Sequence, residues 1–262
     1  MQLKIYQIDA FTDKVFSGNP AAVCPLENWI DDDIMQKIAA ENNLAETVFY
    51  VKEENQFIIR WFTPTVEVDL CGHATLAAAF VLFNFGNYTE KTINFFSPRS
   101  GILKVTKDED FLTLNFPTDT IENLEITNDL VDCFDLKPKE ILKGKTDYLY
   151  IFESEENIKN IQPDFDKISK FNIRGLIISA KGNEVDFVSR FFAPQSGINE
   201  DPVTGSAHTT LIPYWSKELN KNELTAIQLS DRKGFLKCTY LNERVEISGQ
   251  GKLFLIGDIF ID

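Results

Sequence analysis

Histidine and cysteine are scarce in this sequence, with two and four copies among 262 residues. The histidines are His73 and His208, and no CxxC pair or Cys/His spacing of the kind used in zinc sites occurs. We therefore expect no metal site, and we find no convincing site for a nucleotide or other cofactor. The widely separated cysteines indicate reduced thiols and a cytoplasmic protein.

Positive charge is also in short supply. Lysine and arginine number 26 against 40 aspartates and glutamates, which gives a formal net charge of −14. Proteins that bind nucleic acids or anionic membranes need an excess of cations to neutralise phosphates. We therefore expect neither a nucleic-acid partner nor a membrane partner, although acidity alone does not name a substrate.

Long apolar runs are missing as well. The longest uninterrupted run covers residues 76–83, far short of the roughly 20 residues that a membrane-spanning helix needs. The first residues have no apolar signal core, because Asp9 interrupts them early.

Alternating, β-rich segments recur along the chain and predict a strand-rich protein. Strands are expected at residues 3–11, 44–51, 57–62, 92–96, 102–106, 111–116, 148–152, 175–180, 186–192, 226–230, 235–240, 244–248 and 253–261, with a short one ending near residue 24. Three aspartates at residues 31–33 precede helical apolar spacing and predict an amphipathic helix to about residue 43.

The most informative segment is residues 72–85, a predicted helix that carries AAAFVLF and has hardly a polar face. A helix that is apolar all round must be buried on every side, so a sheet must wrap around it. A second helix is expected from Ser206 to about Leu219, with a kink at Pro213.

The sequence contains a weak internal repeat. Residues 60–76 (RWFTPTVEVDLCGHATL) and 190–211 (RFFAPQSGINEDPVTGSAHTTL) both begin with arginine, two aromatics, a small residue and proline. One pair of copies indicates duplicated halves. We expect an α+β fold of two pseudo-symmetric lobes, each a barrel-like sheet around a central helix. The predicted boundaries are 1–117, to which the C-terminal strand is a candidate to return, a connector at 118–128, and 129–262.

The two helix starts, Gly72 and Gly205, are candidate substrate-binding positions. Helix N-termini present unpaired N–H groups that bind carboxylates, so a small anionic molecule is the expected ligand. His73 follows Gly72, and a histidine there is disfavoured as a cation, so we expect a neutral imidazole that can donate or carry a proton. His208 lies one turn inside the second helix and is expected only to pack.

Asp201 and Ser206 each allow two interpretations. Asp201 is either a helix cap or a residue that orients a base or contacts ligand. Ser206 beside Gly205 suits an oxyanion cradle, or it is a simple N-cap. No GxSxG motif surrounds Ser206, so a serine hydrolase is weakly supported.

Glu46 and Cys71 are the remaining candidates. Glu46 opens an apolar strand: if buried it can act as a proton shuttle, and otherwise it is ordinary surface alternation. Cys71 precedes a helix start, which favours its thiolate, although a buried small hydrophobe is the preferred interpretation. The matching position in the second repeat is Thr204, so two-thiol epimerisation is disfavoured.

Several motifs, in order, resemble the PhzF-like isomerase family of phenazine biosynthesis. They are the opening 24 residues, AETVF, FTP followed by GHATL, and FFAPQSGINEDPVTGSAH. The resemblance implies the diaminopimelate-epimerase fold with the site in the cleft between lobes. It also implies a cofactor-free isomerase that is commonly a homodimer.

The resemblance also assigns roles by motif position. It implies a proton-moving glutamate at Glu46, a histidine at His73, polar site residues at Asp201 and Ser206, and backbone donors at Gly72 and Gly205. In the phenazine enzyme the substrate is dihydro-hydroxyanthranilate. This sequence departs from the usual motif at Ala74, where proline is common, and at Cys71, which aligns with a catalytic cysteine of the epimerase superfamily.

Three functions therefore stay open from the sequence. The first is an isomerase that uses Glu46 as acid and base on a small, carboxylate-bearing, cyclic or unsaturated substrate. The second is an epimerase or dehydratase that depends on Cys71. The third is a non-catalytic binder of small molecules.

Overall fold

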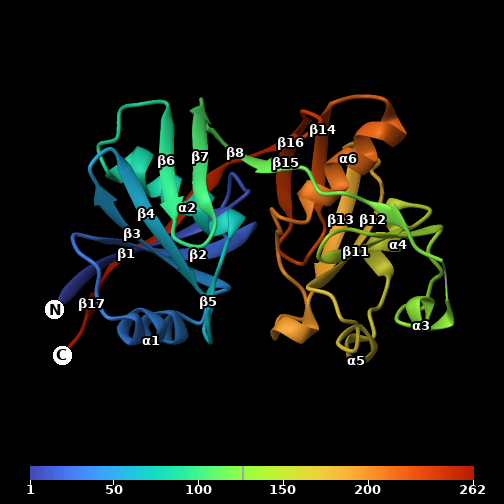
Figure 1. The fold of residues 1–262 in the computed structure, drawn as a ribbon, viewed down its shortest axis with the longest axis horizontal. Coiled ribbons are helices and arrows are strands. Elements are labelled where there is room, and N and C mark those ends of the chain that lie inside the picture. Colours follow the sequence, from blue (N-terminus) through green and yellow to red (C-terminus); the bar gives the residue numbers. More distant parts are fainter. Residues whose placement is uncertain (126) are drawn as a thin grey trace. The chain divides into compact units, whose positions relative to one another are not determined.

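The computed structural model describes residues 1–125 and 127–262, and the chain divides into two compact units. The first unit comprises Met1–Asn115 and Ser248–Asp262, and the second comprises Phe116–Ile247. Strands dominate and helices are few, so the fold is mixed α+β (Figure 1). Among the described residues, no helix combines the length and the apolar composition that crossing a bilayer requires.

Elements from the first part of the chain, together with the last strand, build the first unit. They are β1 (Gln2–Ala10), β2 (Asn19–Leu26), α1 (Asp32–Asn42), β3 (Glu46–Glu53), β4 (Gln56–Phe62), β5 (Glu67–Val68), α2 (Gly72–Phe85), β6 (Thr92–Ser97), β7 (Gly101–Asp108), β8 (Phe111–Pro117) and β17 (Gly251–Phe260). The C-terminal strand β17 pairs antiparallel with β1, with Gln2 opposite Phe260 and Ala10 opposite Gly251.

Strand pairing in the first unit mixes directions. β1 pairs antiparallel with β2, which runs parallel to β3, and β3 pairs antiparallel with β4. β4 runs parallel to β6, and β6, β7 and β8 follow as an antiparallel meander. Because parallel neighbours need a crossover, α1 lies between β2 and β3, and α2 lies between β4 and β6.

Helix α2 is the centre of the first unit (Figure 1). Every residue from His73 to Ala79 is buried, as are Val81 and Leu82, so the helix has no solvent face over its first three turns. It contacts β1, β2, β3 and β17. The prediction of a helix at residues 72–85 that is buried on all sides is confirmed, and only the last turn emerges, where Phe85 is 39% exposed.

The second unit contains the remaining elements. They are β9 (Glu122–Asn123), α3 (Asn128–Val131), β10 (Glu140–Lys143), β11 (Asp147–Ile151), α4 (Glu155–Asn160), α5 (Phe165–Ile168), β12 (Gly175–Lys181), β13 (Phe187–Phe192), the 3-10 helix η1 (Pro194–Ser196), α6 (His208–Leu219), β14 (Glu223–Gln228), β15 (Gly234–Tyr240) and β16 (Arg244–Gly249), which runs past the unit boundary. The sequence analysis did not anticipate β5, β9, β10 or α3. Residue 126 of the predicted connector 118–128 lies outside the described residues, and the described part of that range falls in the second unit.

Helix α6 begins two residues later than predicted. The predicted start, Ser206, lies in a turn over residues 205–207, and the helix starts at His208. The turn is tighter than an α-helix, because His208 N–H donates to Gly205 O at 3.1 Å and Thr209 N–H donates to Ser206 O at 3.1 Å, three residues back in each case. The helix continues through Pro213 to Leu219, so the proline does not end it.

Each copy of the sequence repeat contains an equivalent ion pair between its arginine and a glutamate. Arg60 in β4 donates from Nε to Glu67 at 2.7 Å, and its guanidinium lies 5.2 Å from the ring of Phe62. Arg190 in β13 donates from Nε to Glu200 at 2.8 Å, and its guanidinium lies 5.0 Å from the ring two residues on, Phe192. Alternate residues of a strand share one face, which explains the arginine–aromatic spacing. The repeated motif is therefore built around paired, mostly buried charges in each unit.

Candidate functional site

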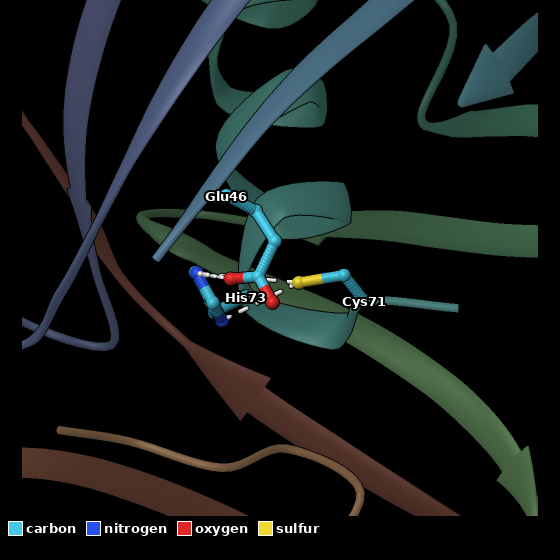
Figure 2. Close-up of side chains that lie close together, drawn as sticks. All are labelled: Glu46, Cys71 and His73. Atoms are coloured by element: carbon cyan, nitrogen blue, oxygen red, sulfur yellow. Dashed lines mark hydrogen bonds and ion pairs between the residues drawn. The ribbon is translucent and has the colours of Figure 1, made fainter. Parts of the chain in front are cut away.

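Three predicted side chains converge in the first unit (Figure 2). Glu46, the first residue of β3, places Oε2 3.1 Å from Nε2 of His73, in the first turn of α2. Their side chains are 14% and 5% exposed. Cys71, at the N-cap position of α2, places its sulfur 3.5 Å from Nδ1 of His73. Glu46 therefore has the largely buried carboxylate that its interpretation as a proton shuttle requires.

The Glu46–His73 contact is close, but its alignment is poor. Oε2 of Glu46 is buried and makes no well-aligned hydrogen bond with any residue that the structure describes. A buried carboxylate oxygen that is not committed to a strong hydrogen bond is suited to accept a proton from a bound molecule.

A fourth residue, Asn19, was missed by the sequence analysis. It opens β2, is fully buried, and places Nδ2 3.2 Å from Nδ1 of His73. The preceding Gly18 has φ +66°, and a Cβ there would lie 2.1 Å from the carbonyl oxygen of Ala10, so only glycine fits this turn. The Ser-Gly-Asn-Pro turn signal located the segment, but only the tertiary structure shows that it delivers Asn19 to the histidine.

The expectation of a neutral His73 is wrong. Burial opposes protonation, but the neighbouring Cys71 sulfur and Glu46 carboxylate outweigh it, so the pKa of His73 lies well above its usual value. Burial, together with the charge of Glu46, raises the pKa of Cys71 to about 11, so its thiol is protonated at neutral pH. Cys71 is buried, as its preferred interpretation as a small hydrophobe predicts, and desolvation outweighs the helix N-terminus that would favour a thiolate.

Glu46→Gln should lower the pKa of His73, because it removes the carboxylate that favours the imidazolium. The raised pKa stabilises the folded state below the pKa of an unfolded histidine, about 6.5, and this stability is lost as pH rises through the folded pKa. An NMR titration of the imidazole signals measures the change. His208 serves as an internal reference, and Glu53→Gln, at the exposed end of β3, as the control. An unchanged pKa in Glu46→Gln would assign the shift to another group.

The same cluster brings together possible metal ligands. One donor atom from each of Glu46, Cys71 and His73 lies within 4.8 Å of the others, close enough to hold an ion. Counting histidines and searching for sequential spacing did not find this set, because its members come from two separate segments. Cys71 and His73 would both have to bind an ion in their deprotonated forms, so metal binding at this cluster would release protons.

The predicted residues of the second unit form a separate network. Asp201 accepts a hydrogen bond from the hydroxyl of Thr204 at 2.5 Å, and its carbonyl accepts from the amide of Gln228 at 2.8 Å. Gln228 in turn accepts from the Thr204 N–H at 2.8 Å. Since α6 starts at His208, Asp201 is not its cap, and the capping interpretation is wrong for both Asp201 and Ser206.

Ser206 and Gly205 lie in the turn that precedes α6. Gly205 contributes its carbonyl to that turn, and Ser206 accepts a hydrogen bond from Arg174 at 2.6 Å. His208 is fully buried, places Nδ1 2.9 Å from the Thr204 carbonyl, and lies 5.9 Å from the ring of Phe187. Burial lowers the pKa of His208 to about 4, so its ring is neutral and it packs as predicted.

The six predicted site residues thus fall into two sets. Glu46, Gly72 and His73 belong to the first unit, with Gly72 as the first residue of α2. Asp201, Gly205 and Ser206 belong to the second unit, within six residues of one another in sequence. Within the first set the structure shows a direct contact, between Glu46 and His73.

Comparison with known proteins decides the family. The family described as "Phenazine biosynthesis-like protein" matches residues 8–257. The chain belongs to this PhzF-like family. It is 46% identical over 261 residues to an uncharacterized isomerase of Pseudomonas aeruginosa, with 100% of both chains covered. A crystal structure of a PhzF-family protein of Enterococcus faecalis matches with a TM-score of 0.97 and 47% identity, again over 100% of both chains.

More distant structural neighbours extend the likeness to other enzymes by fold alone. A probable proline racemase of Agrobacterium radiobacter matches this PhzF-like chain with a TM-score of 0.66 at 8% identity. The match covers 99% of this chain and 93% of that one. The expected likeness to the diaminopimelate-epimerase group of folds is therefore confirmed at the level of the racemase and epimerase fold.

Proposed function

We propose that this PhzF-like protein is a cofactor-independent isomerase that moves a proton on a small carboxylate-bearing substrate, cyclic or unsaturated. The observation that carries the proposal is the buried Glu46 carboxylate 3.1 Å from His73. Family membership and the names of the relatives, which are called isomerases, support the same reaction class.

The chemistry needs one group that both removes and returns a proton. Glu46 takes a proton from a substrate carbon, the electron pair delocalises into the conjugated system, and the carboxylic acid of Glu46 then protonates a second carbon. His73, whose pKa is raised, can donate to the developing charge. General acid–base catalysis of this type contributes roughly 10²–10⁴-fold to rate.

The remaining predicted residues have binding roles in this proposal. Gly72 opens α2, whose N-terminus has no side-chain cap, so its amides are suited to an anionic substrate. In the second unit, Asp201 is proposed for catalysis, and it accepts from Thr204 beside Gly205 and Ser206, which are proposed for substrate binding.

Solvent exchange tests the proposal. In D₂O, with dihydro-hydroxyanthranilate as the trial substrate that the family resemblance supplies, part of the product should carry deuterium, because the proton held by Glu46 can exchange with solvent before it is returned to the substrate. A trial substrate that binds and is recovered unchanged would favour the non-catalytic binder instead.

A Cys71-dependent reaction is the second candidate, favoured by the 3.5 Å approach of the sulfur to His73. The buried, protonated thiol argues against it, so Cys71→Ser should retain turnover within about threefold. Steady-state kinetics and alkylation of the wild-type protein measure this. Loss of activity in both experiments would make Cys71 the catalytic group.

A homodimer is also part of the proposal. Large apolar side chains lie exposed on β17 and beside it: Phe16, Phe254, Leu255, Ile256 and Phe260, with 70%, 45%, 43%, 47% and 76% exposure. The register of β17 shifts at Phe254, and four of the five side chains lie on this one strand, so they form an apolar strip along it. A second copy of this chain is the proposed occupant.

Ile256→Lys should convert the dimer to a monomer, because it places a charge in the apolar strip. Light scattering coupled to size-exclusion chromatography measures the mass. Leu241→Lys is the matched control, since Leu241 is 46% exposed but lies in the second unit. A monomeric wild-type protein, or a variant that stays dimeric, would remove β17 as the interface.

We further propose that the two units are pseudo-symmetric, each a barrel-like sheet around its helix. The matching Arg60–Glu67 and Arg190–Glu200 pairs support this. A cytoplasmic location remains a prediction, supported by four free, buried cysteines.

A further inference from the structure

Arg174 received no role in the sequence analysis, yet the second unit holds it firmly. It precedes β12, and its guanidinium pairs with Asp147, the first residue of β11: Nε donates to Oδ1 at 2.9 Å, and Nη2 donates to Oδ2. The Asp147 side chain is 2% exposed, whereas that of Arg174 is 41% exposed. A buried carboxylate therefore fixes one edge of a guanidinium that stays accessible.

Two further contacts fix the same arginine. The ring of Phe191 lies 5.4 Å from the guanidinium, and the Gln195 amide donates to the Arg174 carbonyl at 2.8 Å. A Cβ on Gly175 would lie 2.1 Å from the Phe191 ring, so glycine is needed for the ring to reach this position. The head group and the backbone of Arg174 are thus both held in place.

The third nitrogen of the guanidinium faces Ser206. Nη1 donates to Ser206 Oγ at 2.6 Å. Because a guanidinium can only donate, Oγ must accept, and the serine hydrogen is free to point to another acceptor. The second hydrogen on Nη1 is a further donor beside it. The pair therefore presents an O–H and an N–H side by side.

We propose that Arg174 and Ser206 form a carboxylate-binding subsite in the second unit, with Arg174 as the residue that selects carboxylates over neutral analogues. Two adjacent donors match the two oxygens of a carboxylate, and hydrogen bonds to a charged acceptor are the stronger kind. A carboxamide of the same shape turns an NH₂ group toward one of the donors. In a protein with a formal net charge of −14, an anion needs such a fixed cation. The inference rests on the proposed function, because it names the substrate group that the subsite takes.

Arginine side-chain NMR tests the subsite without any turnover. The probes are cyclohex-1-ene-1-carboxylate and its carboxamide. The carboxylate should shift the Nε–H signal of Arg174 and the amide signals of residues 205–207. It should also bind about tenfold or more tightly than the carboxamide. If the carboxylate leaves the Arg174 signal unmoved up to its solubility limit, the subsite is overturned.

Substitutions distinguish a role of Arg174 in selecting carboxylates from a purely structural role. Arg174→Gln should abolish the preference for the carboxylate, and Arg174→Lys should keep part of it by retaining the charge without the planar fork. Arg99→Gln, at a side chain that is 46% exposed, is the control and should keep the full preference. An Arg174→Gln protein that melts normally and keeps the preference would mean that Arg174 only ties down the turn. If Arg174→Gln does not fold, the Arg174→Lys result and the wild-type shifts decide.

The result of the probe-binding experiment does not depend on Glu46. Probe binding in Glu46→Gln should shift the Arg174 signal as in wild type. Failure of the proton-transfer reaction would then leave the subsite intact, and failure of the subsite would leave the reaction untouched.

Discussion

Glu46→Gln should lower turnover by about 10²–10⁴-fold while the protein stays folded. Glutamine has the size of glutamate and can occupy the same largely buried position at the start of β3, beside His73. It cannot accept a proton from carbon at neutral pH, so the step that breaks the C–H bond loses its base. Steady-state kinetics on the trial substrate measure the loss.

Two controls define this result. Glu53→Gln makes the same chemical change at the exposed end of β3 and should leave turnover unchanged. Glu46→Asp keeps the carboxylate but withdraws it by one methylene, so it should retain more activity than the glutamine variant, because proton transfer depends on hydrogen-bond reach. Equal activity of Glu46→Gln and wild type would show that another residue moves the proton.

Leu76→Ala should destabilise the first unit by about 2–5 kcal/mol. Leu76 is fully buried, with 0% exposure. Strands β1, β2, β3 and β17 enclose its helix, α2. Removing three carbon atoms leaves a cavity that rigid strands on all sides cannot collapse into. Denaturant unfolding gives the loss, and amide hydrogen exchange should place it in the first unit.

The matched control for Leu76→Ala is Leu70→Ala, two residues before α2, where the side chain is 39% exposed. An exposed site of this kind is expected to cost within about 0.5 kcal/mol. Similar losses for the two variants would mean that the strands around α2 relax into the cavity, and that the helix does not organise the unit.

The sequence predicted α2, the helix around which the first unit folds. It predicted the bounds of other elements less accurately. The helix at 72–85 was predictable, because an apolar surface on every side leaves only one environment for it. The start of α6 was not predictable. The i→i+3 hydrogen bonds to the carbonyls of Gly205 and Ser206 form a turn, and in sequence this turn looks like a helix cap. Short pieces such as β9 and β10 carry too few residues to show a period.

For the candidate site, the sequence supplied residues and the structure supplied contacts. Glu46 and His73 are 27 residues apart, so no local pattern shows that they meet at 3.1 Å. The pKa of His73 is raised by its neighbours Cys71 and Glu46, which outweigh the helix N-terminus, so the prediction of a neutral ring did not account for them. Asn19 and Arg174 were missed for the same reason: each reaches its partner only through tertiary structure.

The central claim is that one buried carboxylate both removes and returns the migrating proton. Its most direct test is a single turnover in H₂O of substrate deuterated at the reacting carbon, with mass spectrometry of the product. A single shielded base predicts that part of the deuterium reappears at the new position, and that Glu46→Gln forms no such product. A product whose migrated hydrogen comes entirely from solvent would contradict the claim of a shielded base, because the proton that was removed would not be the one returned.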